Sequence, residues 1–176
     1  MKPTLLALVA AAAASLAMGA NAHATLEQQE AASGSYYKAV MRIGHGCDGA
    51  ATQTLRIAIP EGVISVKPMP KPGWSLETVT GAYARSYDFH GRTLTEGVKE
   101  IIWTGNLEDA HYDEFVFRAK LHSSLEPGTT LYFATVQECT TGENAWVEIP
   151  AEGQDSHDLK SPAPGLAIIA PAGHTH

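Results

Sequence analysis

The chain has few basic side chains and a low density of charge. Lysine and arginine together number 12 against 19 aspartate and glutamate residues, and charged residues make up 18% of the 176 residues. Lys2 is the only charged residue before position 23, so the rest of the chain carries a net charge near −8 with neutral histidines. This acidic balance makes nucleic acid and anionic membrane surfaces poor partners.

Past its N-terminus the chain lacks an apolar run of membrane-spanning length. The short apolar run at 166–170 has five residues, whereas a span needs about 20. The N-terminal run "TLLALVAAAAASLAMG" follows Lys2 and precedes small residues, which is the pattern of a secretory signal. Residues 1–22 are therefore interpreted as a signal peptide, 23–170 as one domain and 171–176 as a disordered tail whose His174 and His176 could form a weak additional metal site.

Two signal-cleavage sites overlap in "GANAHATLEQQE", residues 19–30. Cleavage after Ala22 leaves His23 as the first residue, and cleavage after Ala24 leaves Thr25. The first is favoured because the polar Asn21 closes the apolar run just ahead of it. Export predicts a periplasmic or secreted protein.

Cysteine is almost absent, with Cys47 and Cys139 as the only two. In an exported chain a single pair is read most simply as one disulfide. A pair of thiolate metal ligands is the alternative, which an oxidising compartment and a spacing unlike that of a metal knuckle disfavour.

No stretch keeps a helical period for three turns, whereas alternation of apolar and polar residues dominates. Many short strands between turn residues predict an all-β fold, an antiparallel immunoglobulin-like or cupredoxin-like β-sandwich with one disulfide. The predicted strands are 36–43, 54–60, 62–68, 74–80, 82–89, 99–105, 113–121, 130–139 and 145–150, with a last strand or strap at 165–170.

A histidine at the start of the mature chain is a copper ligand by its chemistry. Its free α-amine and its imidazole Nδ1 can close a chelate ring on one ion, and nitrogen ligands suit Cu(II). Soft ligands for Cu(I) are scarce after residue 22, because Met41 falls on an inward strand face and Met69 stands alone in a proline-rich turn.

Two strands add further candidates. In "DEFVFRAKL" the phenylalanines face inward, which places Glu114 on the outer face. In "AWVEIP" the alternation puts Ala145, Val147 and Ile149 inward and Trp146 outward, where so large an aromatic side chain needs a covering segment or a site. On residue type alone, Glu114 has the simpler interpretation of a solvated acid.

The segments "YKAVMRIGHGCDGAATQTLRIAIPEGVISVKPMPKPGW", "WTGNL", "DEFVFRAKL", "LYFATVQECTTGENAW" and "SPAP" resemble the YcnI-like family of exported copper-binding domains from His23 to about Pro164. The resemblance implies a β-sandwich with a Cu(II) site called a monohistidine brace. That site uses the amine and imidazole of an N-terminal histidine, a glutamate of a mid-chain strand and a nearby tryptophan, which map to His23, Glu114 and Trp146. Many relatives also carry a C-terminal membrane helix, whereas this sequence ends in "PAGHTH", so a soluble exported form is expected.

The predicted function is Cu(II) binding for acquisition, delivery or homeostasis, with other exported copper-handling proteins or a membrane copper transporter as partners. It is not an enzymatic function, because the sequence contains no nucleophile motif, phosphate loop or H-E-x-x-H. Two alternatives stay open: a copper-dependent oxidative enzyme, which needs a second histidine beside His23, and a metal-free sandwich that binds a protein.

Overall fold

The computed structural model describes residues 23–171. The predicted signal peptide and residues 172–176, with His174 and His176, lie outside this range. Its elements are strands and one short 3-10 helix, η1 (Ser156–Asp158). The strands are β1 (Thr25–Leu26), β2 (Glu30–Ala32), β3 (Tyr36–Ile43), β4 (Thr52–Ala58), β5 (Val63–Pro68), β6 (Ser75–Phe89), β7 (Arg92–Leu107), β8 (Asp113–Leu121), β9 (Thr130–Tyr132), β10 (Thr135–Cys139), β11 (Glu143–Trp146) and β12 (Gly165–Ile169).

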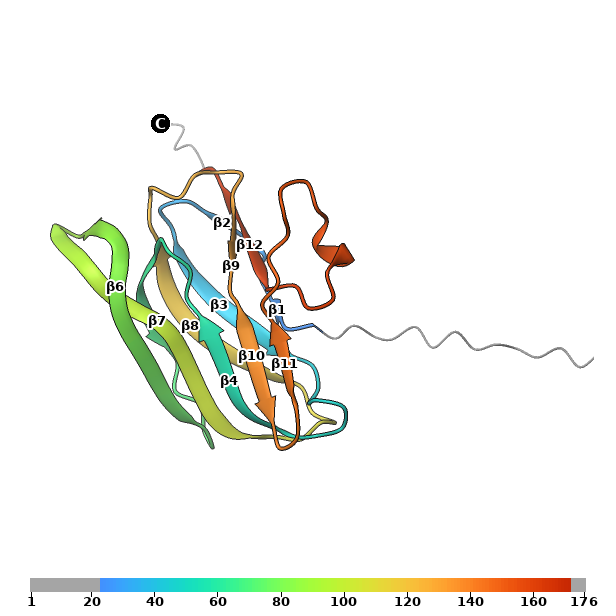
Figure 1. Ribbon diagram of the computed structural model, residues 1–176. Coiled ribbons are helices and arrows are strands. Elements are labelled where there is room, and N and C mark those ends of the chain that lie inside the picture. Colours follow the sequence, from blue (N-terminus) through green and yellow to red (C-terminus); the bar gives the residue numbers. More distant parts are fainter. Residues whose placement is uncertain (1–22, 172–176) are drawn as a thin grey trace, which may run out of the picture.

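Two larger sheets face each other and a small sheet closes one end (Figure 1). The first has the order β1-β3-β8-β5 and the second the order β11-β10-β4-β7-β6, all paired antiparallel. The small sheet, β2-β12-β9, contains the parallel pair β2 and β12. This arrangement confirms the predicted all-β sandwich and the strand at the C-terminal end.

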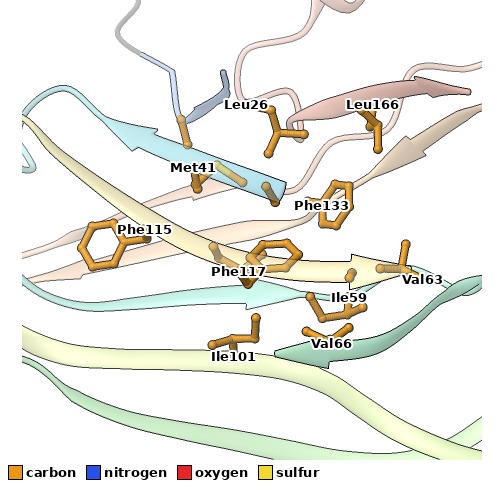
Figure 2. Packing of buried hydrophobic residues seen from close by; sticks show 14 of the residues in the cluster. Leu26, Met41, Ile59, Val63, Val66, Ile101, Phe115, Phe117, Phe133 and Leu166 are labelled. Carbon is orange, nitrogen blue, oxygen red and sulfur yellow. The ribbon is translucent and has the colours of Figure 1, made fainter. Parts of the chain in front are cut away.

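The core lies between the two larger sheets and follows the alternation of the sequence (Figure 2). The side chains of Phe115, Phe117, Ala119 and Leu121 on β8 are fully buried, and they pack with alternate residues of β3 and β4. These inward faces confirm the predicted alternation in β3, β4 and β8. The outward residues of β3 and β8 are thereby left free to form a site.

Several predicted strands have different bounds in the structure. The strand predicted at 99–105 is part of the longer β7, and the strand predicted at 145–150 is replaced by β11, which ends at Trp146. The strands predicted at 74–80 and 82–89 are one strand, β6, because pairing with β7 continues through Gly81 and Gly97. At Gly97 a Cβ would collide with the ring of Tyr83, so only glycine allows this close crossing. The strand predicted at 130–139 divides into β9 and β10 because Phe133 donates its N–H to Pro164 and Ala134 accepts from Ala58, which belongs to the other sheet.

A disulfide joins Cys47, in the loop after β3, to Cys139 at the end of β10, with 6.0 Å between the Cα atoms. It confirms the predicted pair. Beside it, Gln137 is fully buried and donates hydrogen bonds to the carbonyl of His45, at 2.7 Å, and to the hydroxyl of Thr52. The loop around His45 is thus held by a buried amide as well as by the disulfide. Over residues 23–171 the chain forms no helix with the length and hydropathy of a membrane span.

Candidate metal centre

The candidate site lies on the outer face of the β1-β3-β8-β5 sheet. The strand register pairs Thr25 with Arg42 and Arg42 with Glu114, so these three residues form one row across β1, β3 and β8. Directly paired residues point to the same face of a sheet. The row therefore brings the start of the domain and the middle of the chain together.

His23 lies two residues before Thr25 and is half-buried, while Ala24 and Leu26 are buried in the core. The alternation places His23 on the same outer face as Thr25. Because β1 and β8 both run antiparallel to β3, the residues before Thr25 and before Glu114 lie at the same end of the sheet. With strands spaced about 4.8 Å apart, β1 and β8 are about 10 Å from each other.

Glu114 is half-buried and held by its neighbours. The hydroxyl of Tyr112 donates a hydrogen bond of 2.6 Å to Glu114 Oε1. Partial desolvation, and then this hydrogen bond, raise the pKa of Tyr112 above its usual range. The preceding residue, Asp113, instead forms an ion pair with Lys71, whose Nζ lies 2.6 Å from Asp113 Oδ1. Of the two neighbouring acids, Glu114 is thus the one presented on the outer face.

Arg42 stands between two carboxylates. Its Nη2 lies 3.1 Å from Glu27 Oε1, and its Nε lies 4.0 Å from Glu114 Oε1. The Nε atom is buried and has no hydrogen-bond partner within residues 23–171. The alternation of β3 places Arg42 on the outer face, but only the register of β3 against β8 shows that it lies beside Glu114.

The prediction that Trp146 faces outward is wrong. Its side chain is 6% exposed and belongs to the core cluster, whereas Val147 and Ile149, predicted inward, are 45% and 61% exposed. The cause is that β11 ends at Trp146, so the alternation does not continue into 147–150. The register pairs Trp146 with Thr135 and Asn144 with Gln137. Thr135 and Gln137 are fully buried, so Trp146 lies on the inward face of β11. Trp146 shares its buried cluster with Ala24 and Leu26 of the N-terminal segment.

A cavity of about 360 Å³ opens beside β1. His23 and Thr25 line it from one side, and Tyr132 of β9 and Pro164 line it from the other. His157 of η1 also reaches this cavity, on the loop that projects from the sandwich in Figure 1. Two other histidines lie elsewhere in the fold: His90 follows β6, and His122 follows β8.

The atoms that could bind a metal ion near His23 and Glu114 are nitrogen and oxygen atoms. Within residues 23–171 no group of three or more histidine, cysteine, aspartate or glutamate side chains is arranged to hold a metal ion. A site here would use one imidazole and one carboxylate, with the α-amine of His23 as the third donor if cleavage precedes it. Such a set fits Cu(II) by ligand type, and it offers no sulfur because both cysteines form the disulfide.

Comparison with known proteins places the chain in a family and a fold. The family model described as "Domain of unknown function (DUF1775)" matches residues 23–168. A crystal structure of an uncharacterized protein from Nocardia farcinica with an immunoglobulin-like fold superposes with a TM-score of 0.60 at 22% identity, covering 84% of this chain and 99% of that one. This likeness supports the immunoglobulin-like sandwich and nothing further. No curated protein matches the chain significantly.

Proposed function

The chain belongs to the family described as a domain of unknown function (DUF1775), whose model matches residues 23–168, and we propose that it is an exported protein that binds one Cu(II) ion. The α-amine and Nδ1 of His23 and the carboxylate of Glu114 are its ligands. One observation carries the proposal: the register of β1, β3 and β8 gathers the N-terminal segment and Glu114 on one outer face. The start of the family match at His23 agrees with it.

The oxidation state follows from the ligands. Met41 is fully buried and both cysteines are oxidised, which leaves the thioether of Met69 as the one exposed soft donor among the described residues. Amine, imidazole and carboxylate ligands favour Cu(II) over Cu(I). Because the amine binds only when deprotonated, copper affinity rises with pH towards the usual amine pKa of about 8.

The residues around Glu114 prepare it for this role. Tyr112 holds one carboxylate oxygen through its hydroxyl, and Arg42 offsets the charge of Glu27 and Glu114 before metal arrives. When bound, Cu(II) would take over part of that charge compensation. Trp146 belongs to the same buried cluster as Ala24 and Leu26, the residues on either side of Thr25. We propose that it forms part of the apolar wall behind the N-terminal segment that carries the ion.

Export implies that this copper is handled outside the cytoplasm. We propose that the protein acts in the periplasm or outside the cell and exchanges copper with other exported copper-handling proteins or a membrane copper transporter. Its role is carriage and not catalysis, because only one imidazole belongs to the proposed ligand set.

The proposal is tested by calorimetric titration of Cu(II) into protein whose intact mass begins at His23. Glu114→Gln removes the carboxylate ligand, and Glu27→Gln is the matched control because Glu27 also contacts Arg42. We expect one site in the parent protein, at least about tenfold weaker binding in Glu114→Gln and little change in Glu27→Gln. Equal affinity for all three proteins would remove Glu114 from the site.

His157 supports a second candidate function. Its side chain lines the same cavity as His23, so a loop movement could add a second imidazole and complete a three-nitrogen copper site. That set belongs to a copper-dependent oxidative enzyme. Hydrogen peroxide production by the copper-loaded protein, lost in His157→Ala, would favour this function, and its absence in the parent protein would reject it.

A further inference from the structure

A row of three cations crosses the outer face of the β1-β3-β8-β5 sheet. The register pairs Lys38 of β3 with Arg118 of β8, and Arg118 with Lys67 of β5. All three side chains are exposed. Two residues away on each strand, Lys120 pairs with Tyr36. The guanidinium of Arg118 and the Nζ atom of Lys120 lie over the Tyr36 ring, at 3.9 Å and 4.8 Å from its centroid. We call Tyr36, Lys38, Lys67, Arg118 and Lys120 the basic face.

The basic face is unfavourable for folding taken alone. Like charges directly opposite each other on neighbouring strands destabilise a sheet by several tenths of a kcal/mol per pair. Lysine on an edge strand also protects that edge from unwanted pairing, which would account for Lys67 on β5. It does not account for Lys38 and Arg118, because β3 and β8 are the two central strands of the sheet.

The cations of the basic face also lack acidic neighbours. Among residues 23–171, none of Lys38, Lys67, Arg118 and Lys120 has a carboxylate within 4.0 Å. Four basic residues elsewhere in the fold are paired with carboxylates, such as Arg56 with Glu138 and Lys99 with Glu61. Arg85, Arg92 and Lys160 have no carboxylate within 4.0 Å among the described residues, but they are not gathered in one row of a sheet. Lys120 does donate a hydrogen bond to the carbonyl of Gly34, which leaves its charge uncompensated. In a chain with more acidic than basic residues, cations without carboxylate partners on one sheet face produce a local positive surface.

We propose that the basic face is a docking surface for an acidic segment of a partner protein. The row of three cations spans three strands, about 10 Å, which matches about three residues of an extended chain. Tyr36 is 44% exposed beside this row and offers an apolar surface to the same segment. A short acidic segment suits this chain better than a membrane or a nucleic acid, because its net negative charge repels extended anionic surfaces.

The surface lies on the same strands as the candidate metal centre. Lys38 and Arg118 are each four residues from the paired residues Arg42 and Glu114, about 13 Å along the sheet. A partner docked on the basic face would thus lie next to the centre. The docking inference itself goes beyond copper binding and does not depend on it, so it is tested on metal-free protein.

The probe is a fluorescein-labelled peptide of eight glutamates, and binding is followed by fluorescence anisotropy at low salt. The test variant is Lys38→Gln with Lys67→Gln. The matched control is Arg92→Gln with Lys160→Gln, which removes two exposed charges outside the basic face. We expect the test variant to bind about fivefold more weakly, the control to change less than twofold, and salt to weaken binding by the parent protein.

A folding defect is separated from a docking defect by urea unfolding. The test variant should unfold at the same or a higher urea concentration than the parent, because the like-charge row is relieved. Equal weakening in test and control variants, or no peptide binding by the parent, would overturn the proposal. So would stronger binding to phosphatidylglycerol vesicles than to the peptide, or self-association of the parent that the test variant abolishes.

Discussion

Arg42 Nε lies 4.0 Å from Glu114 Oε1, buried and without a hydrogen-bond partner in the described part of the chain, on the strand next to the one that carries the carboxylate. The same guanidinium is held by Glu27 at 3.1 Å. A cation fixed beside a proposed copper ligand competes with the metal for that ligand. We therefore propose that Arg42 lowers the affinity of the proposed centre for a metal ion and favours its release.

Replacing this cation should strengthen copper binding. A unit charge about 4 Å from a carboxylate contributes about 1 kcal/mol in water-like surroundings, so Arg42→Gln should bind Cu(II) roughly fivefold more tightly. Arg118→Gln removes an exposed charge of the same sheet and serves as the control. Competition with a coloured Cu(II) chelator measures both. Weaker binding by Arg42→Gln would mean that Arg42 positions Glu114 and does not compete with the ion.

Trp146 should report on bound copper. Cu(II) quenches a nearby indole, and we propose that Trp146 lies closest to the ion among the tryptophans. Emission of the parent protein should fall on addition of one equivalent of Cu(II), and it should fall equally in Trp74→Phe. In Trp146→Phe most of this quenching should disappear. Quenching that survives in Trp146→Phe but not in Trp74→Phe would place the ion elsewhere.

The disulfide should carry a large share of the stability. It closes a loop with a sequence separation of 92, for which the chain-entropy model gives roughly 4–5 kcal/mol. Replacing both Cys47 and Cys139 by alanine should lower the free energy of unfolding by about that amount, measured by urea titration. A cost below about 1 kcal/mol would show that the buried hydrogen bonds of Gln137 hold this region without the covalent link.

Stability should fall at alkaline pH through Tyr37. Its side chain is 2% exposed, and its hydroxyl donates a hydrogen bond of 2.6 Å to the carbonyl of Gln28. Burial, with a smaller effect of the Glu27 charge, raises the pKa of Tyr37 far above its usual value. The folded state thus holds the phenolic proton more tightly than the unfolded state, so this contribution is complete below about pH 10 and is lost as the pH rises further.

The matching variant is Tyr37→Phe, which should lose about 1 kcal/mol at neutral pH with the hydrogen bond. Its free energy of unfolding should decline less between about pH 9 and 11 than that of the parent. Tyr36→Phe changes an exposed tyrosine of the same strand and is the control. Parallel declines in the parent and Tyr37→Phe would assign the alkaline loss to other buried tyrosines, such as Tyr87.

The inward faces of β3, β4 and β8 could be predicted because strong alternation over seven or more residues fixes which side of a strand is buried. The disulfide could be predicted because the chain has only two cysteines. Trp146 could not be placed, since β11 has four residues and the apolar positions after it belong to a loop. Two or three alternating residues at the end of a strand do not determine which of its side chains are buried.

The neighbours of Glu114 were beyond prediction for a different reason. Alternation assigns Arg42 and Glu114 each to an outer face, but it does not give the register that sets them side by side. The same limit concealed the basic face, whose lysines and arginine come from three strands that are distant in the sequence. Single-strand patterns predict faces, and only pairing between strands reveals the charges that meet on them.

The central claim is that a free amine and the imidazole of His23 hold one Cu(II) together with Glu114. The most direct measurement is electron paramagnetic resonance of one equivalent of Cu(II) with protein that begins at His23, compared with the same protein extended by one methionine. The account predicts nitrogen hyperfine structure and tight binding in the first, and a changed spectrum with much weaker binding in the second. Identical spectra and affinities in the two proteins would contradict it.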